Sequence, residues 1–163
     1  MPKDSSIKTN GYTLIEILVA ITIIVIIFGV GLLNFRDFSR RQSLSSFARQ
    51  VKGDLSLARE NAVSGEKPAS VFCSLPNTLD GYSFRLESDT NYVIEAVCSG
   101  GDVEVKSVDL PLDLSIEAQL ESPILFKVLS RGTNLSGDVT ITLNQNKTGN
   151  SYNVYVTKAG EVK

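Results

Sequence analysis

The sequence predicts an α+β fold in which one long N-terminal helix packs on an antiparallel β-sheet domain. Residues 17–33 contain no charge, residues 44–62 carry apolar side chains at helical spacing, and from residue 69 the apolar pattern changes to a period of two. A spacing near 3.6 indicates a helix with one buried face, and a period of two indicates a half-buried strand. The 163 residues suffice for one modest domain beyond the apolar segment.

The apolar segment, residues 12–33, is long enough to cross a membrane. Its 22 residues span ~33 Å at ~1.5 Å per residue, and a bilayer core is ~30 Å thick. One carboxylate, Glu16, lies near its start. An ionised side chain in a membrane helix is energetically expensive, so Glu16 is a candidate functional residue. A plain single-pass anchor would explain the length of the segment but not the order of residues 11–16.

We expect the helix to continue without interruption to about residue 63. No proline occurs between Lys3 and Pro68, and Ser64-Gly65 is a typical helix end. The charged residues between the apolar ones, Asp54 among them, are expected on the wetter faces. The apolar stripe that should carry the domain comprises Leu44, Phe47, Val51, Leu55, Ala58 and Ala62.

The rest of the chain reads as short strands separated by turns. The turns are marked by Gly, Asn, Asp and Pro clusters, such as residues 100–102 and 136–138. The picture is an antiparallel sheet, or two, packed on the second half of the helix. The predicted strands are residues 70–75, 82–86, 92–98, 103–108, 112–118, 124–129, 139–143 and 152–157.

The start of the apolar segment resembles the N-terminus of type IV pilins and pseudopilins. The pattern of that family is glycine, an aromatic residue, Thr-Leu-Ile-Glu and then an apolar helix. Gly11 matches the glycine, Tyr12 stands where Phe is usual, and residues 13–16 match directly. An ordinary secretory signal is cut after its apolar region, not before it, so this order is specific.

The resemblance implies a type IV pilin fold with three parts. Residues 1–11 would be a prepilin leader, residues 12–33 the transmembrane or filament-core half of the helix, and residues 34–163 the exported globular domain with the second half of the helix. A prepilin peptidase would cut between Gly11 and Tyr12, and the new amine of Tyr12 would be methylated. Glu16 would pair with that amine, on its own or a neighbouring subunit, and so set the register of assembly.

The resemblance also implies partners and a location. Assembly would involve other pilin or pseudopilin subunits and, indirectly, an inner-membrane platform and a motor ATPase. Before assembly the chain would be a single-pass protein in membrane lipid, with its C-terminal domain outside the cytoplasm, and then part of a cell-surface or periplasmic filament. The arginines at 36, 40 and 41 oppose this topology by the positive-inside rule; the motif, the cysteines and the β-rich remainder favour it.

Two features point more loosely to a subclass. The run Ala58-Arg59-Glu60-Asn61-Ala62 and the closing segments 139–143 and 152–162 resemble H-type pseudopilins and FimT-like minor pilins. A structural subunit of a type IV pilus or a type II secretion-like pseudopilus is therefore one function class. A minor pilin that binds a ligand, for DNA uptake or adhesion, is the other.

Cys73 and Cys98 are the only cysteines, 25 residues apart, and each falls in a predicted strand. With no histidine in the chain they cannot complete a zinc site, and no metal or other cofactor is expected. On an exported domain they are candidates for a disulfide. The alternative is two buried free thiols.

Composition disfavours catalysis and nucleic-acid binding. Without histidine, no Ser-His-Asp or Cys-His arrangement can form, and no carboxylate lies in a catalytic motif, so we expect no enzyme activity. The net charge of −2 argues against binding DNA through total charge. A DNA-binding patch is the less favoured reading of the C-terminal basic residues Lys127, Arg131, Lys147, Lys158 and Lys163.

Overall fold

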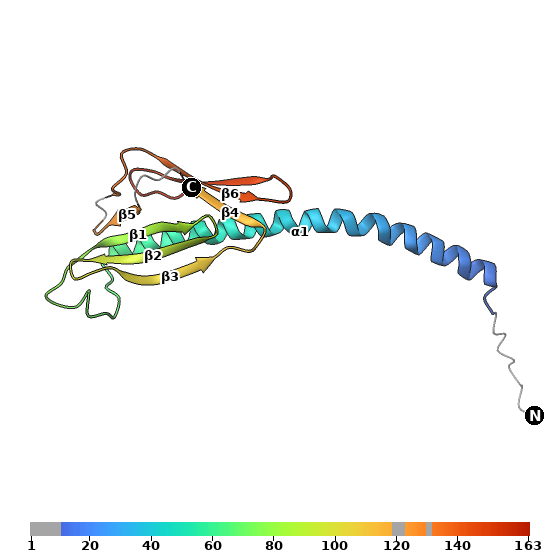
Figure 1. Cartoon of the computed structure of the whole chain (residues 1–163), viewed down its shortest axis with the longest axis horizontal. Helices are drawn as coiled ribbons and strands as arrows, with labels where there is room; N and C mark the ends of the chain where they lie inside the picture. Colours follow the sequence, from blue (N-terminus) through green and yellow to red (C-terminus); the bar gives the residue numbers. More distant parts are fainter. Residues whose placement is uncertain (1–10, 119–122, 130–131) are drawn as a thin grey trace, which may run out of the picture. The chain divides into compact units, whose positions relative to one another are not determined.

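The described residues form one helix and seven strands in a computed structural model of the chain (Figure 1). The structure describes residues 11–118, 123–129 and 132–163, without the side chains of residues 30–34. It divides into two compact units, Met1–Ser39 and Arg40–Lys163, each of which is described by itself. The elements are α1 (Leu14–Ser64), β1 (Leu79–Ser88), β2 (Asn91–Cys98), β3 (Val103–Asp109), β4 (Leu114–Ala118), β5 (Ile124–Lys127), β6 (Val139–Gln145) and β7 (Ser151–Val156).

Helix α1 ends where the sequence predicts. The Gly65 amide donates to the Ala62 carbonyl, and the Glu66 amide donates to the Asn61 carbonyl. This pair of bonds closes a helix when the residue after its last turn adopts positive φ, which glycine tolerates. Gly65 has φ of 68°. The bonds satisfy carbonyls that the helix itself leaves without partners.

The predicted apolar stripe of α1 is the helical side of the domain core. Its six residues and Ala48 are all buried. They pack with aromatic and aliphatic side chains of β1 and β2 and with aliphatic side chains of β4, β6 and β7. The prediction that Asp54 lies on a wetter face is wrong, because only 7% of its surface is exposed. The spacing explains this, since position 54 lies three residues after Val51 and four residues before Ala58, on the buried side.

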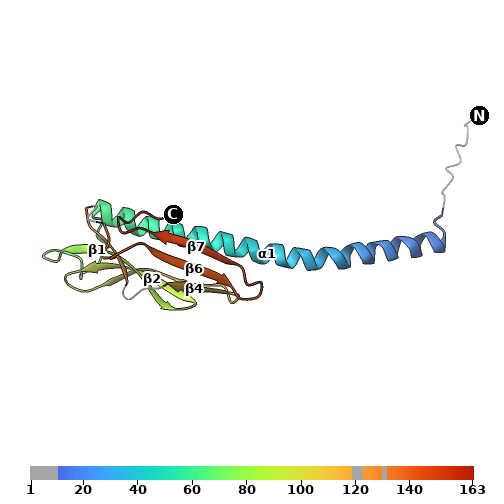
Figure 2. The same ribbon diagram turned by 90° about the horizontal axis from the view of Figure 1, so that it is seen from above.

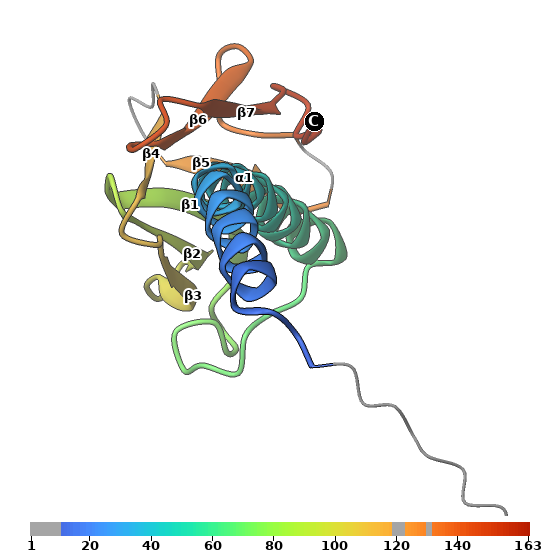
Figure 3. The same cartoon turned by 90° about the vertical axis from the view of Figure 1, so that its right-hand side faces the viewer.

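Two antiparallel sheets complete the domain. One has the strand order β3-β2-β1-β5 and the other the order β4-β6-β7. Figures 2 and 3 show the strands gathered along the domain half of α1, with β6 and β7 on a different side from β2 and β3. The α+β fold and seven of the eight predicted strands are confirmed, although several strand ends differ by a few residues.

The predicted strand at residues 70–75 is wrong. The segment is a series of turns, and the first strand begins only at Leu79. Consecutive short bonds hold it, from the Cys73 amide to the Ser70 carbonyl and from the Asn77 amide to the Ser74 carbonyl. The run Val71-Phe72-Cys73 is apolar but does not alternate with polar residues, which is the pattern that a half-buried strand requires.

No helix within the described residues is both long enough and apolar enough to cross a membrane. The predicted span, residues 12–33, includes residues 30–33, whose side chains lie outside the described part of the chain.

Candidate functional site

The junction between Gly11 and Tyr12 lies before the helix, in backbone without regular structure. Both residues are exposed, and a Cβ added at Gly11 would meet no atom within 4 Å. A peptidase must bind several residues of extended chain around the bond that it cuts. The junction has that accessibility, while the rest of the predicted leader lies outside the described residues.

Thr13 begins the helix and links the junction to Glu16. The Glu16 amide donates to Thr13 Oγ1 at 3.3 Å and to the Thr13 carbonyl at 3.1 Å. A threonine before the first helical residue, with glutamate three positions later, is the capping-box sequence, which satisfies amide groups at a helix start. A carboxylate in the first turn also interacts favourably with the positive end of the helix dipole. The place of Glu16 in this cap was not predicted from the sequence, where the motif indicated only a role in assembly.

The anchor half of the helix, residues 14–29, exposes apolar side chains on every side. The large ones from Leu14 to Phe28 are between 49% and 83% exposed. Thr22 does not break this surface, because its hydroxyl donates to the Val19 carbonyl at 2.8 Å. A helix that is apolar all round is stable only in lipid or in a protein core. This surface therefore needs a partner that the chain's described residues do not supply.

Cys73 and Cys98 form a disulfide, with their Cα atoms 5.4 Å apart. Cys98 ends β2 as expected, whereas Cys73 lies in the turns before β1. The bridge therefore fastens the connection after α1 to the first sheet. Two hydrogen bonds reinforce it, from the Ser99 amide to the Thr78 carbonyl and from the Thr78 amide to Ser99 Oγ.

The C-terminal basic residues lie on several segments of the domain, and two of those segments are neighbours: the Lys127 amide donates to the Gly132 carbonyl, and the adjacent Thr133 amide donates to the Lys158 carbonyl. Lys127 lines a small crevice of about 30 Å³ with Arg59, Val63, Phe126 and Gly160. Lys147 follows β6 in the hairpin before β7, and Lys163 pairs with Glu161 at 3.1 Å on the surface. Arg131 lies outside the described residues. Arg59, which the sequence analysis did not include, is the helix residue that joins Lys127 at the crevice.

Asp54 holds α1 to the first sheet through a polar contact that sequence reasoning missed. The Tyr92 hydroxyl donates to Asp54 Oδ2 at 2.6 Å, and Lys106 Nζ donates to both carboxylate oxygens at 2.7 and 2.8 Å. Burial, and then the bond to Asp54, raise the pKa of Tyr92 well above its usual range. The side chains come from α1, β2 and β3, so the contact ties three elements together.

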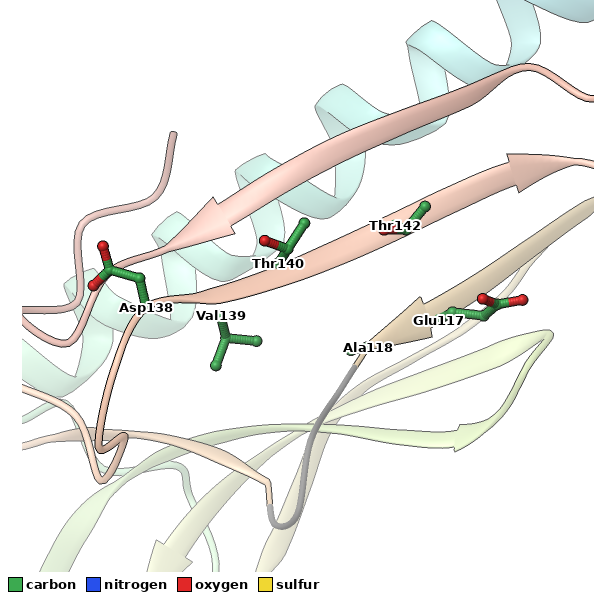
Figure 4. Close-up of a pocket in the computed structure, with 6 residues that line it drawn as sticks. All are labelled: Glu117, Ala118, Asp138, Val139, Thr140 and Thr142. Atoms are coloured by element: carbon green, nitrogen blue, oxygen red, sulfur yellow. The ribbon is translucent and has the colours of Figure 1, made fainter.

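A mostly polar hollow lies beside the second sheet. It has a volume of about 670 Å³ and is lined by residues of β4 and β6 and by Asp138. Asp138 Oδ1 accepts a bond from the Lys158 amide, and in Figure 4 the Glu117 carboxylate points away from Asp138. Among the residues described, no group of three potential ligands could hold a metal ion. The two carboxylates do not form an acid–base pair.

Comparisons with known proteins agree on the N-terminus and the fold. A family model described as the prokaryotic N-terminal methylation motif matches residues 7–32. A crystal structure of the type IV minor pilin FimU of Pseudomonas aeruginosa is similar, with a TM-score of 0.57 and 18% identity over 77% of this chain and 90% of that one. The chain has the leader motif and the fold of type IV pilins.

A second crystal form of FimU gives the same pilin fold, with a TM-score of 0.53 and 18% identity over 74% of this chain and 90% of FimU. No curated protein matches the chain. At this identity the likeness to FimU shows the fold alone. The motif, in contrast, falls on the residues of the predicted leader junction, of the helix cap and of the apolar first half of α1.

Proposed function

We propose that the chain is a structural subunit of a type IV pilus or of a type II secretion-like pseudopilus. It would be made as a membrane-anchored precursor, cleaved after Gly11, methylated at Tyr12 and assembled through residues 12–33. The observation that carries this proposal is the anchor half of α1, apolar on every side, directly behind an exposed glycine junction. An enzyme or a soluble binding protein needs neither feature.

Glu16 would act when anchor helices of several subunits pack together. Cleavage would turn the Tyr12 amide into a charged amine four residues before Glu16, and neither charge can be hydrated inside a helix bundle. Pairing the two offsets both desolvation penalties. A subunit that docks one step out of register would leave both charges without partners.

Three kinds of partner follow from this role. The prepilin peptidase would act first, on the precursor in membrane lipid. Other pilin or pseudopilin subunits would then replace lipid around residues 12–33. The inner-membrane platform protein and the motor ATPase would take part in assembly indirectly. The domain, residues 34–163, would lie outside the cytoplasm throughout.

The test is the N-terminus of the mature chain. Mass spectrometry of protein from sheared filaments should find methylated Tyr12 as the first residue. Precursor that keeps residues 1–11, in cells with an active prepilin peptidase, would contradict the proposal. As a matched control, Gly11→Val should block cleavage, because the added side chain occupies the junction, while Gly53→Val, at an open position of α1, should leave cleavage intact.

A second function, ligand binding by a minor pilin, has one specific observation in its favour. Arg59 and Lys127 lie at the same crevice, and two neighbouring cations could contact a phosphate backbone. Binding of DNA by the domain in a gel-shift assay should then weaken as salt rises and should be lost in a variant with Arg59→Ala and Lys127→Ala. Binding that is equally strong with Lys147→Ala and Lys163→Ala would localise it to the crevice. No shift at low salt would exclude this function.

A further inference from the structure

Shortly after the anchor half, α1 is rich in arginine and phenylalanine. We call residues 35–41 the collar. It contains three arginines and one aspartate, a net charge of +2 in a chain whose net charge is −2. Its two aromatic side chains, Phe35 and Phe38, are 66% and 65% exposed. The arginines at both ends of the collar, Arg36 and Arg41, are exposed as well. None of these four side chains is among the core residues that the structure describes.

The length of the anchor indicates where the collar lies. This inference rests on the proposed function, in which residues 12–33 cross the membrane. Counted from Tyr12, a hydrocarbon core of ~30 Å takes about 20 residues of helix, and a headgroup layer of roughly 5–7 Å takes about four or five more. Phe35 and Arg36 then fall in the headgroup layer. Arg41 follows ~8 Å further along the continuous helix α1, which is about one Debye length at physiological salt.

Charge distinguishes between the two partners that could cover the collar. Copies of this chain that pack in parallel would bring their arginines to the same height, where like charges repel each other. Phospholipid headgroups instead present phosphate oxygens, which arginine binds through two parallel hydrogen bonds. Phenylalanine side chains are favourable at the boundary between headgroups and acyl chains. We propose that the collar binds anionic phospholipid headgroups of the extracytoplasmic leaflet and so fixes the depth of the anchor before assembly.

This binding would account for three arginines that follow a segment whose C-terminal end faces outward. By the positive-inside rule, the arginines at 36, 40 and 41 oppose that topology. A single cation close to an anionic lipid surface strengthens binding by about fivefold. The arginines would therefore strengthen anchoring once the domain has crossed the membrane, which offsets the cost that the rule describes.

The first test measures the lipid preference of the full chain. The chain is inserted into vesicles of equal phosphatidylglycerol and phosphatidylcholine and extracted in mild detergent, and its bound lipids are counted by native mass spectrometry. A variant with Arg36→Gln and Arg41→Gln should lower the ratio of bound phosphatidylglycerol to phosphatidylcholine by roughly tenfold or more, since each cation contributes about fivefold. The lysines at 3 and 8 are present in every variant and do not affect the comparison.

The matched control removes the same charge further along α1. Arg49→Gln with Lys52→Gln replaces two exposed cations that lie ~12 Å or more beyond Arg41, past one Debye length. This variant should keep the lipid ratio of the unmodified chain. An equal fall in both double variants would overturn the inference, because the preference would then follow total charge. An unchanged ratio after Arg36→Gln and Arg41→Gln would overturn it as well.

The second test measures the depth of the collar. Because Cys73 and Cys98 are joined in the disulfide, one introduced cysteine can carry a spin label. In the same vesicles, a label at Phe35→Cys should be shielded from a water-soluble nickel chelate. A label at Glu60→Cys, on an exposed position of α1, should be accessible to it. Neutralising the two collar arginines should make the label at position 35 more accessible.

A third label separates this inference from the proposed function. A label at Ile24→Cys, in the anchor half, should be shielded in vesicles whether or not the collar binds lipid. If that label is shielded while the label at Phe35→Cys is as accessible as the one at Glu60→Cys, the inference alone is overturned. The same holds if the label at position 35 becomes shielded only in filaments, which would assign the collar to neighbouring subunits. A label at Ile24→Cys that the chelate reaches would overturn both the inference and the proposed function.

Discussion

The two halves of α1 have opposite kinds of surface, although they form one continuous helix. Residues 44–62 bury one stripe against two sheets and present a polar surface elsewhere. Residues 14–29 expose apolar side chains all round. Isolated helices gain little from propensity alone, and most of their stability in proteins comes from packing. The domain half is therefore stabilised within the chain, and the anchor half is stabilised only by what surrounds it.

This difference separates folding from assembly. Changes in the domain half should alter the free energy of unfolding of the domain, because its partners are in the same chain. Changes in the anchor half should leave the domain folded and alter incorporation into filaments. The predictions that follow test that separation, and each is paired with a residue expected to behave differently.

The largest effect is expected at Glu16. Glu16→Ala should leave cleavage at Gly11 largely intact but reduce incorporation by roughly two to four orders of magnitude, since removing one partner of a buried ion pair costs about 3–5 kcal/mol. Glu16→Gln keeps the shape and removes only the charge. If subunits with Glu16→Gln enter filaments as efficiently as the unmodified chain, charge pairing does not set register. The assay should count this chain rather than total filaments.

Next comes Leu55 in the domain half. A chain beginning at Phe35 should fold as a monomer, and Leu55→Ala should lower its free energy of unfolding by about 2–5 kcal/mol, measured by urea denaturation. Leu55 is fully buried and Leu57 is 47% exposed. Leu57→Ala, with the same change in helix propensity, should cost under about 0.5 kcal/mol. Equal effects at both positions would show that the stripe does not face the sheets.

Opening the disulfide should have an effect of similar or smaller size. Reduction, or a variant with Cys73→Ser and Cys98→Ser, should lower the free energy of unfolding of residues 35–163 by about 3 kcal/mol in the loop-entropy model. Non-reducing peptide maps should show the two cysteines linked. Two alkylatable thiols in protein taken directly from the cell exterior would contradict the bridge.

The smallest effect concerns pH. Because burial raises the pKa of Tyr92 in the folded domain, its neutral form stabilises the fold below the unfolded value of about 10. That contribution should be lost as pH rises above about 10, at no more than about 1.4 kcal/mol per pH unit. Urea denaturation of residues 35–163 at pH 8 and 11 measures it. Tyr92→Phe should reduce the alkaline loss, and Tyr152→Phe, on an exposed position of β7, should not.

The features that could be predicted from the sequence are those that the spacing of apolar residues determines. The stripe from Leu44 to Ala62, the helix end at Gly65 and seven strands follow from spacing and from glycine chemistry. Periodicity cannot identify a polar residue whose partners come from distant strands. Asp54 lay on the buried face by its position, but only Tyr92 and Lys106 make that burial favourable.

The prediction of a strand at residues 70–75 was wrong for a different reason. An apolar run usually means burial, and the sequence contains no sign that Val71 and Leu75 are exposed. The bridge to Cys98 allows a short loop to keep these side chains outside. Of the candidate site, the glycine junction and Glu16 could be named from the motif. The cap at Thr13, the crevice at Arg59 and the exposed side chains of Val71 and Leu75 are seen only in the structure.

The cap at Thr13 means that cleavage would change the charge at the start of the helix. In the precursor, residue 12 enters the helix start as a neutral amide. After cleavage the same position would carry a positive amine close to the positive end of the helix dipole, which is an unfavourable placement. Glu16, whose backbone amide bonds to Thr13 in the first turn, carries the charge that can offset it. Cleavage would thus turn a helix start that is stable within one chain into one that is stabilised by packing against neighbouring subunits. Processing would then have to precede assembly.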